Sequence, residues 1–176
     1  NPANIGVGLG LKLSDKFDLA FDWMRVFYSD VASIANPIEA LASTAGFLGE
    51  DEGAGFGWED QDIYKIGLKY KHNKEMDFMI GFNYGEVPMP ASQLLFSALA
   101  PAVTEKHVTA GVTYRPSKST EWTVAYVHAF SNKEEGLANS GGQFDQFFPN
   151  PTLTGPGDMA LEMEQNSIEL SFSFKM

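Results

Sequence analysis

The stretch Met76-Asp77-Phe78-Met79-Ile80-Gly81-Phe82-Asn83-Tyr84-Gly85 alternates large apolar residues with mainly small or polar ones. Side chains of a β-strand point alternately to the two faces of a sheet, so a period of two collects one kind of residue on one face. Phe78, Ile80, Phe82 and Tyr84 would therefore share a face. The stretch predicts a β-strand with one apolar and one more polar face.

The same period of two recurs in six further segments. Near Arg25 the pattern slips, which predicts a β-bulge there, and His128 interrupts an otherwise apolar face. The segments cover residues 5–13, 17–28, 64–71, 107–115, 122–130 and 168–176. Seven strands predict an all-β, antiparallel fold. Such a sheet has two open edges, which only an N-terminal half or a second chain could close into a barrel.

The connections between these segments alternate in length. Short turns are expected at 14–16, 73–75 and 116–119, and long connections near 30–59, 87–103 and 132–163. In an antiparallel sheet this order places every long connection at the same end. Transmembrane β-barrels of the bacterial outer membrane have this layout.

Composition narrows the class of protein. The 176 residues suffice for one domain, and the net charge of -11 disfavours binding to nucleic acid. No run approaches the roughly 20 apolar residues that a membrane helix needs. Cysteine is absent, which excludes disulfide scaffolds and thiolate metal sites.

Alternation alone also fits a soluble β-sandwich or a lipocalin-like lipid-binding protein, whose apolar face points inward. Three features favour a membrane barrel instead. The long connections lie at one end, the non-apolar faces are rich in Gly, Ser and Thr, and aromatic residues gather at strand ends as in interfacial girdles. These aromatic residues are Phe17, Tyr28, Tyr70, Tyr84, Tyr114, Trp122 and Phe130.

A series of short motifs, in order along nearly the whole chain, resembles the outer-membrane long-chain fatty acid transport proteins (the FadL/TodX group). Each motif is weak alone, and their shared order and spacing carry the resemblance. They are Ile5-Gly6-Val7-Gly8, Ser14-Asp15-Lys16-Phe17, Phe21-Asp22, Tyr28-Ser29-Asp30-Val31, Phe56-Gly57-Trp58, Asp60-Gln61, Tyr64-Lys65-Ile66-Gly67, Gly81-Phe82-Asn83-Tyr84-Gly85, Val87-Pro88-Met89-Pro90, Ala100-Pro101-Ala102-Val103, Glu105-Lys106-His107-Val108-Thr109 with Gly111, Ala125-Tyr126 and His128-Ala129-Phe130.

The resemblance implies a 14-stranded barrel with an N-terminal hatch, in the outer membrane of a Gram-negative bacterium. Residues 1–176 would then be the C-terminal part of one barrel domain, without the hatch and the first strands. The implied function is passive, porin-like diffusion of a long-chain fatty acid or another hydrophobic ligand. The implied partners are outer-membrane lipid, lipopolysaccharide and the barrel assembly machinery. One departure is that Lys175 and Met176 follow Phe174, whereas many members end on an aromatic residue.

Two other functions remain open at this stage: an aromatic hydrocarbon channel of the same fold, and a structural or adhesive barrel without transport. An enzyme is not expected, because the three histidines have no closely spaced ligand partner and no nucleophile elbow or phosphate-binding loop occurs. No cofactor and no metal are expected. The acidic residues Glu50-Asp51-Glu52, Glu59, Asp60 and Asp62 lack the spacing of a calcium loop and predict a solvated surface.

Transport of a fatty acid requires a cation for the carboxylate and an apolar surface for the tail. Alternation places Lys65, Lys69 and Arg115 on the polar face, and a bulge would add Arg25. Each is equally open to a salt bridge with Asp18, Asp22 or Asp77. For the tail, the long connections offer apolar residues that either capture ligand or pack as a lid. The candidates are Phe47, Leu48, Leu94, Leu95, Phe96, Leu99, Phe147 and Phe148.

Overall fold

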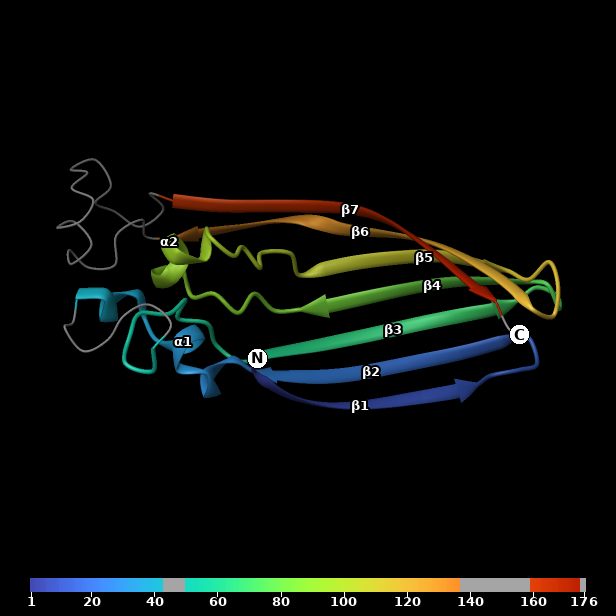
Figure 1. Ribbon diagram of the computed structural model, residues 1–176, viewed down its shortest axis with the longest axis horizontal. Helices are drawn as coiled ribbons and strands as arrows, with labels where there is room; N and C mark the ends of the chain where they lie inside the picture. Colours follow the sequence, from blue (N-terminus) through green and yellow to red (C-terminus); the bar gives the residue numbers. More distant parts are fainter. Residues whose placement is uncertain (43–49, 137–158, 175–176) are drawn as a thin grey trace.

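The computed structural model describes residues 1–42, 50–136 and 159–174. Seven antiparallel strands form one sheet in sequence order, which confirms the predicted fold class (Figure 1). The strands β1 and β7 are the two edges of this sheet. The strands are β1 (Ala3–Lys12), β2 (Phe17–Phe27), β3 (Gln61–Lys71), β4 (Met76–Gly85), β5 (Lys106–Tyr114), β6 (Thr120–Gly136) and β7 (Met159–Phe174).

Short turns join the strands at one end of the sheet, the turn end, as predicted (Figure 1). The turns are stabilised by hydrogen bonds between residues close together in the sequence. The Ser14 hydroxyl accepts a hydrogen bond from the Phe17 amide at 3.1 Å, and the Asn73 side chain accepts one from the Met76 amide at 2.8 Å. Ser and Asn favour turns because their side chains replace a backbone partner in this way.

Strand pairing is continuous from β1 to β5, with no register shift along β2. The predicted bulge near Arg25 is therefore wrong. A shift occurs instead between Ala129 and Asn132, where β6 pairs with β7. Both strands also extend past this point, so residues 132–136 and 159–163 are strand rather than the predicted long connection.

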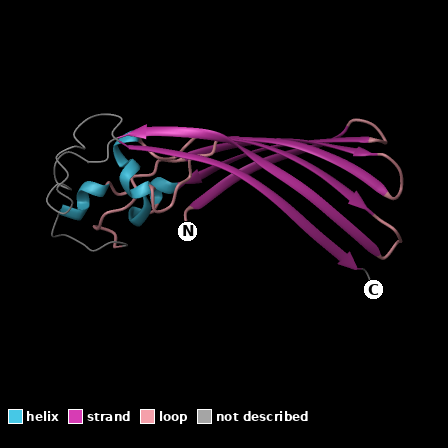
Figure 2. Ribbon diagram, turned by 90° about the horizontal axis from the view of Figure 1, so that it is seen from above, coloured by secondary structure: helices cyan, strands magenta, loops and turns pink. Residues whose placement is uncertain are grey.

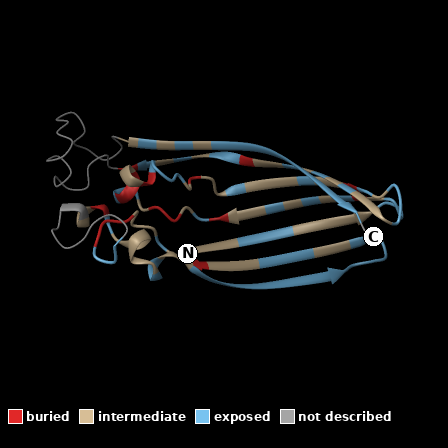
Figure 3. Cartoon of the chain, viewed as in Figure 1, coloured by how far each residue is buried: buried red, intermediate tan, exposed pale blue. Residues whose placement is uncertain are grey.

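The two faces of the sheet differ as alternation requires. We call the face that carries Phe21, Ile66 and Ile80 the apolar face, and the opposite one the polar face. Large hydrophobic side chains on the apolar face are largely uncovered: Ile66 is 47% exposed and Ile80 55%. Figure 3 shows accordingly few buried residues in the strands. Something outside the described chain must cover this face.

Aromatic residues band the apolar face near both of its ends. At the turn end, Phe17 stacks on Tyr70 with ring centroids 5.0 Å apart, and Trp122 contacts Phe172 at 4.7 Å. Nearer the other end, Trp23 on β2, Tyr64 on β3 and Tyr84 on β4 lie opposite one another in the register. The predicted clustering at strand ends is confirmed for Phe17, Tyr70, Tyr84, Tyr114 and Trp122, whereas Phe130 lies within β6 and Tyr28 lies beyond β2. The two bands resemble the paired girdles of membrane barrels.

The long connections gather at the opposite end of the sheet, the loop end, around several short helices (Figure 2). We call residues 28–42, 50–60 and 86–105 the loop cap. Its core includes Ile38 and Leu94, which are 1% and 0% exposed. No described helix is long and apolar enough to cross a membrane. The helices are η1 (Tyr28–Asp30), α1 (Ala32–Ala35), η2 (Ile38–Ala42), η3 (Ala91–Gln93) and α2 (Leu94–Ser97).

Candidate functional site

The strand register places five residues of the polar face opposite one another on adjacent strands. Gly8 on β1 pairs with Asp22 on β2, which pairs with Lys65 on β3. Lys65 pairs with Asn83 on β4, and Asn83 with His107 on β5. We call this set the central polar row. Polar groups from four neighbouring strands therefore converge at one level of the sheet.

Near the turn end, the polar face carries a network of ion pairs centred on Asp77. Its carboxylate lies 2.9 Å from the Lys69 ammonium and 2.8 Å from the Arg115 guanidinium. Arg115 also contacts Glu121 at 2.7 Å. The Asp77 side chain is 5% exposed, so a carboxylate at this depth needs such partners. Lys69 and Arg115, both predicted carboxylate partners, are thus already neutralised by acidic side chains.

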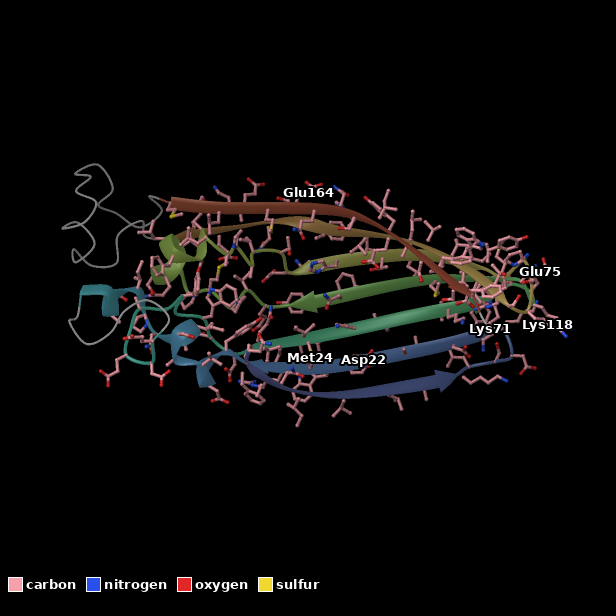
Figure 4. All side chains as sticks on the ribbon, viewed as in Figure 1. Asp22, Met24, Lys71, Glu75, Lys118 and Glu164 are labelled. Atoms are coloured by element: carbon pink, nitrogen blue, oxygen red, sulfur yellow. The ribbon has the colours of Figure 1, made fainter. Side chains whose placement is uncertain are left out.

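A second ion pair joins Lys71 on β3 to Asp18 on β2 at 2.5 Å. Both side chains are about a third exposed, at 36% and 35%. Figure 4 labels Lys71, Glu75 and Lys118 at the turn end. Lys69, Lys71 and Arg115 in this part of the polar face each have a carboxylate partner.

Lys65 differs from these cations. Within the described part of the chain, its ammonium forms no ion pair, although Asp22 is its partner on β2. The reason lies on β1. Gly8 has no side chain, and an oxygen of the Asp22 carboxylate occupies the position that a Cβ of residue 8 would take. Asp22 therefore turns toward β1 and leaves Lys65 with an uncompensated charge.

Two hollows adjoin on the polar face beside this lysine. The first is about 470 Å³ and is lined by Gly6, Val7, Gly8, Asp22, Trp23, Met24, Ile63 and Lys65. The second, nearer the turn end, is about 500 Å³ and is lined mainly by Gly10, Leu11, Lys12, Asp18, Leu19, Ala20, Gly67, Leu68, Lys69 and Met79. A Cβ on Gly10 would meet nothing within 4 Å, which shows how open this wall is. Small residues thus leave space next to one free cation.

Asn83 and His107 continue the row on the other side of Lys65. The Asn83 amide nitrogen lies 3.4 Å from Nδ1 of His107, and Nε2 of His107 lies 3.4 Å from the Thr104 hydroxyl. The side-chain oxygen of Asn83 is buried and has no hydrogen-bond partner among the described residues. Sequence reasoning missed these three residues. The available signal was the position of Asn83 one strand away from Lys65 at the same level.

Arg25 lies on the apolar face, in contrast to the expectation, because β2 has no bulge. Its guanidinium contacts Asp62 at 2.9 Å and Asp60 at 3.4 Å. The Trp23 indole N–H also donates to Asp62, at 3.0 Å. Arg25 is therefore compensated at the loop end of the apolar face, and its predicted contact with ligand would require it to leave these partners.

Asp60 links Ser29 of the loop cap to Arg25 at the end of β2. One of its oxygens accepts hydrogen bonds from the Ser29 hydroxyl at 2.7 Å and the Ser29 amide at 3.1 Å. These bonds, with a smaller contribution from Arg25, hold the pKa of Asp60 below its ordinary value. The described residues contain no group of three acidic, His or Cys side chains that could hold a metal ion.

The apolar residues of the second long connection separate into core and surface. Leu94 is fully buried in the core of the loop cap, as expected if these residues pack on each other rather than form an exposed surface. Phe96 packs against Phe56 with ring centroids 5.9 Å apart, and Leu95 is half-buried. Leu99 is 77% exposed. Phe47, Leu48, Phe147 and Phe148 lie outside the described residues.

Gln93 organises the core of the loop cap. Its side-chain oxygen accepts a hydrogen bond from the Ile38 amide at 2.7 Å, and its nitrogen donates to Glu39 at 3.0 Å. Gly57 has a φ of 64° and lies so close to Gln93 that a Cβ would clash with it. Glycine is favoured here both for its backbone conformation and for its small size. These contacts tie the connections after β2 and β4 together as a lid.

Solved structures share this arrangement of strands. The toluene transporter TodX of Pseudomonas putida matches 99% of this chain at 18% identity, with a TM-score of 0.61. A TodX deltaS2S3 mutant, described as a monoaromatic hydrocarbon channel, matches 100% of this chain at 19% identity, with a TM-score of 0.66. The chain has the fold of the TodX channels. The resemblance to the FadL/TodX group is thereby confirmed at the level of the fold.

The match concerns part of TodX. The chain covers 34% of the length of TodX and 36% of the deltaS2S3 mutant, so it spans about a third of these proteins. TodX is described as a toluene transporter, a function that requires no catalytic motif. No protein-family model and no curated protein matches the sequence.

Proposed function

We propose that this chain forms part of an outer-membrane channel through which hydrophobic small molecules diffuse passively. The observation that carries the proposal is the exposed apolar face with an aromatic band near each end. The Phe17 and Trp23 positions of these bands are six residues apart, or about 20 Å along the strand. The apolar face would meet lipid and the polar face would line the lumen.

The remainder of the barrel belongs to the same proposal. Strands β1 and β7 would pair with further strands to complete a barrel of 14, since backbone groups cannot remain unpaired in hydrocarbon. An N-terminal hatch would occupy the lumen, as the family resemblance implies. Lipopolysaccharide and the assembly machinery are then its expected neighbours in the membrane.

For the ligand, we propose a long-chain fatty acid held by Lys65. Of the four predicted cations, Arg25, Lys69 and Arg115 already have carboxylate partners. Lys65 has no carboxylate partner among the described residues and lines the first hollow, with the more apolar second hollow nearer the turn end. A fatty acid with its carboxylate at the Lys65 ammonium would pair that charge, and its tail would lie along the apolar second hollow.

A monoaromatic hydrocarbon is the second candidate, favoured by the fold of TodX. Such a ligand requires only the apolar walls and makes no use of Lys65. A structural or adhesive barrel without transport remains the third, and the compact loop cap would then serve surface contacts.

The experiment that tests the channel is uptake by a bacterial strain that lacks its own transporter and expresses the full-length protein containing this chain. Cell fractionation first establishes that the protein is in a membrane. Labelled oleic acid and labelled toluene are then offered separately. Uptake of oleic acid supports the fatty acid channel, and uptake of toluene alone supports the hydrocarbon channel. A folded barrel in the outer membrane that takes up neither would favour the structural alternative.

A further inference from the structure

We propose that Asn83 makes a second hydrogen bond to the polar head group of a ligand held at Lys65, and so selects compounds with a hydroxyl or carboxyl group over plain hydrocarbons. This inference rests on the proposed function and deepens it, because it assigns a specificity-determining residue and a class of ligand.

The register places the two residues side by side. Lys65 and Asn83 are directly opposite on β3 and β4, and both lie on the polar face. Directly opposite residues of an antiparallel pair have Cβ atoms about 4.5–5.5 Å apart. One small group between them would lie within reach of both side chains once the Asn83 amide, whose oxygen is buried, rotates toward it.

The two side chains offer complementary hydrogen-bonding groups, donors on Lys65 and an acceptor on Asn83. The Lys65 ammonium has donors and no ion-pair partner within the described residues. The buried side-chain oxygen of Asn83 is an acceptor with no hydrogen-bond partner in the described part of the chain. A hydroxyl group both accepts and donates. It would accept from Lys65 and donate to Asn83, and a hydrocarbon can do neither.

His107 allows the same site to take a carboxylate. Its ring stands between Asn83 and Thr104, 3.4 Å from each. The neutral imidazole has one donor and one acceptor nitrogen, and exchanging them reverses both hydrogen bonds. Asn83 could then turn its oxygen to His107 and its amide N–H groups to the ligand. His107 is thus a positioning residue that supports either orientation of Asn83.

Other groups near the pair do not compete for the ligand. Asp22 is turned toward Gly8, and the neighbours of Asn83 along β4 on the polar face, Gly81 and Gly85, have no side chains. The head group would therefore meet Lys65 and Asn83, with His107 behind the amide.

The test compares binding of dodecanol, dodecanoic acid and dodecane to the purified full-length protein that contains this chain. Asn83→Leu keeps the size of the side chain and removes its hydrogen-bonding groups. Thr109→Val is the matched control, because Thr109 lies on the polar face of β5 outside the central polar row. Circular dichroism and gel mobility establish that each variant is folded.

We expect Asn83→Leu to weaken binding of dodecanol roughly five- to tenfold and to leave dodecane unchanged, while Thr109→Val changes neither. Equal weakening for dodecanol and dodecane would mean an effect of shape and would overturn the inference. Unchanged binding of all three ligands would mean that the Asn83 oxygen holds water only, and would also overturn it.

Failure of the proposed function would look different. If the unaltered protein binds none of the three ligands, the channel proposal fails and this inference with it. If Lys65→Met weakens dodecanoic acid but Asn83→Leu weakens no ligand, the proposed role of Lys65 stands and the role of Asn83 is overturned.

Discussion

The carboxylate of Asp22 lies over Gly8, and its partner on the next strand, Lys65, forms no ion pair among the described residues. We infer that the glycine on one strand sets the charge available two strands away. In the same part of the structure the polar-face cations Lys69, Lys71 and Arg115 all have carboxylate partners.

Gly8→Ala should displace the Asp22 carboxylate toward Lys65, because the added methyl group takes its place. An ion pair would then compete with the ligand, and affinity for a fatty acid should fall roughly two- to fivefold, as expected for an exposed pair. Gly10→Ala is the control, since its Cβ meets nothing within 4 Å. Equal affinities for the two variants in a binding titration would show that Gly8 does not control Lys65.

Asp77→Asn should destabilise the barrel by about 1–3 kcal/mol, because Lys69 and Arg115 both lose their shared carboxylate. Asp18→Asn removes a more exposed pair with Lys71 and should cost less than about 1 kcal/mol. Urea unfolding of the full-length protein in lipid vesicles measures both changes in the free energy of unfolding. A larger loss for Asp18→Asn would contradict the central place given to Asp77.

The fold could be predicted from the sequence more fully than the site, and the reason is physical. A period of two in residues 76–85 fixes which face each side chain takes, and this predicted the strands and the polar position of Lys65. Arg25 was misplaced because alternation cannot show that the carboxylates of Asp62 and Asp60 would satisfy a guanidinium on the apolar face.

The other differences also depend on long-range contacts. The extension of β6 beyond Ala129 carries polar residues on both faces and leaves no apolar period to detect. In β7, Met159, Leu161 and Met163 do alternate with polar or small residues, so this part of the strand was detectable from the sequence. The pairings of Asp77, and the lack of an ion pair at Lys65 among the described residues, follow from which residues the register brings opposite each other. Leu94 and Leu99 have the same chemistry, and only their burial in the folded loop cap, 0% against 77% exposed, separates a core residue from a surface one.

Leu94→Ala and Leu99→Ala should therefore act on different properties. Leu94→Ala should destabilise the loop cap by about 2–5 kcal/mol, because it opens a cavity in a fully buried site. Hydrogen exchange of the loop-cap amides measures this local stability. Leu99→Ala should leave exchange unchanged, since Leu99 is 77% exposed. Equal protection in both variants would contradict the role of Leu94 in the core of the lid.

The hydrogen bonds of Asp60 predict a pH dependence. Its pKa is lower in the folded protein than its ordinary value, so the ionised form stabilises the fold at higher pH. That contribution is lost as the pH falls through the lowered pKa, from about pH 4 downward. The Tm of Asp60→Asn should lie below that of the unaltered protein at pH 7, and the difference should shrink toward pH 3. A difference that stays constant or grows on acidification would contradict this assignment.

The most direct test of the account compares uptake of oleic acid and of toluene by cells expressing the full-length protein, with and without Lys65→Met. The account predicts that the unaltered protein imports oleic acid and that Lys65→Met lowers this uptake roughly tenfold or more, while toluene uptake is unchanged. Oleic acid uptake that is indifferent to Lys65→Met, at equal amounts of folded barrel in the outer membrane, would contradict it.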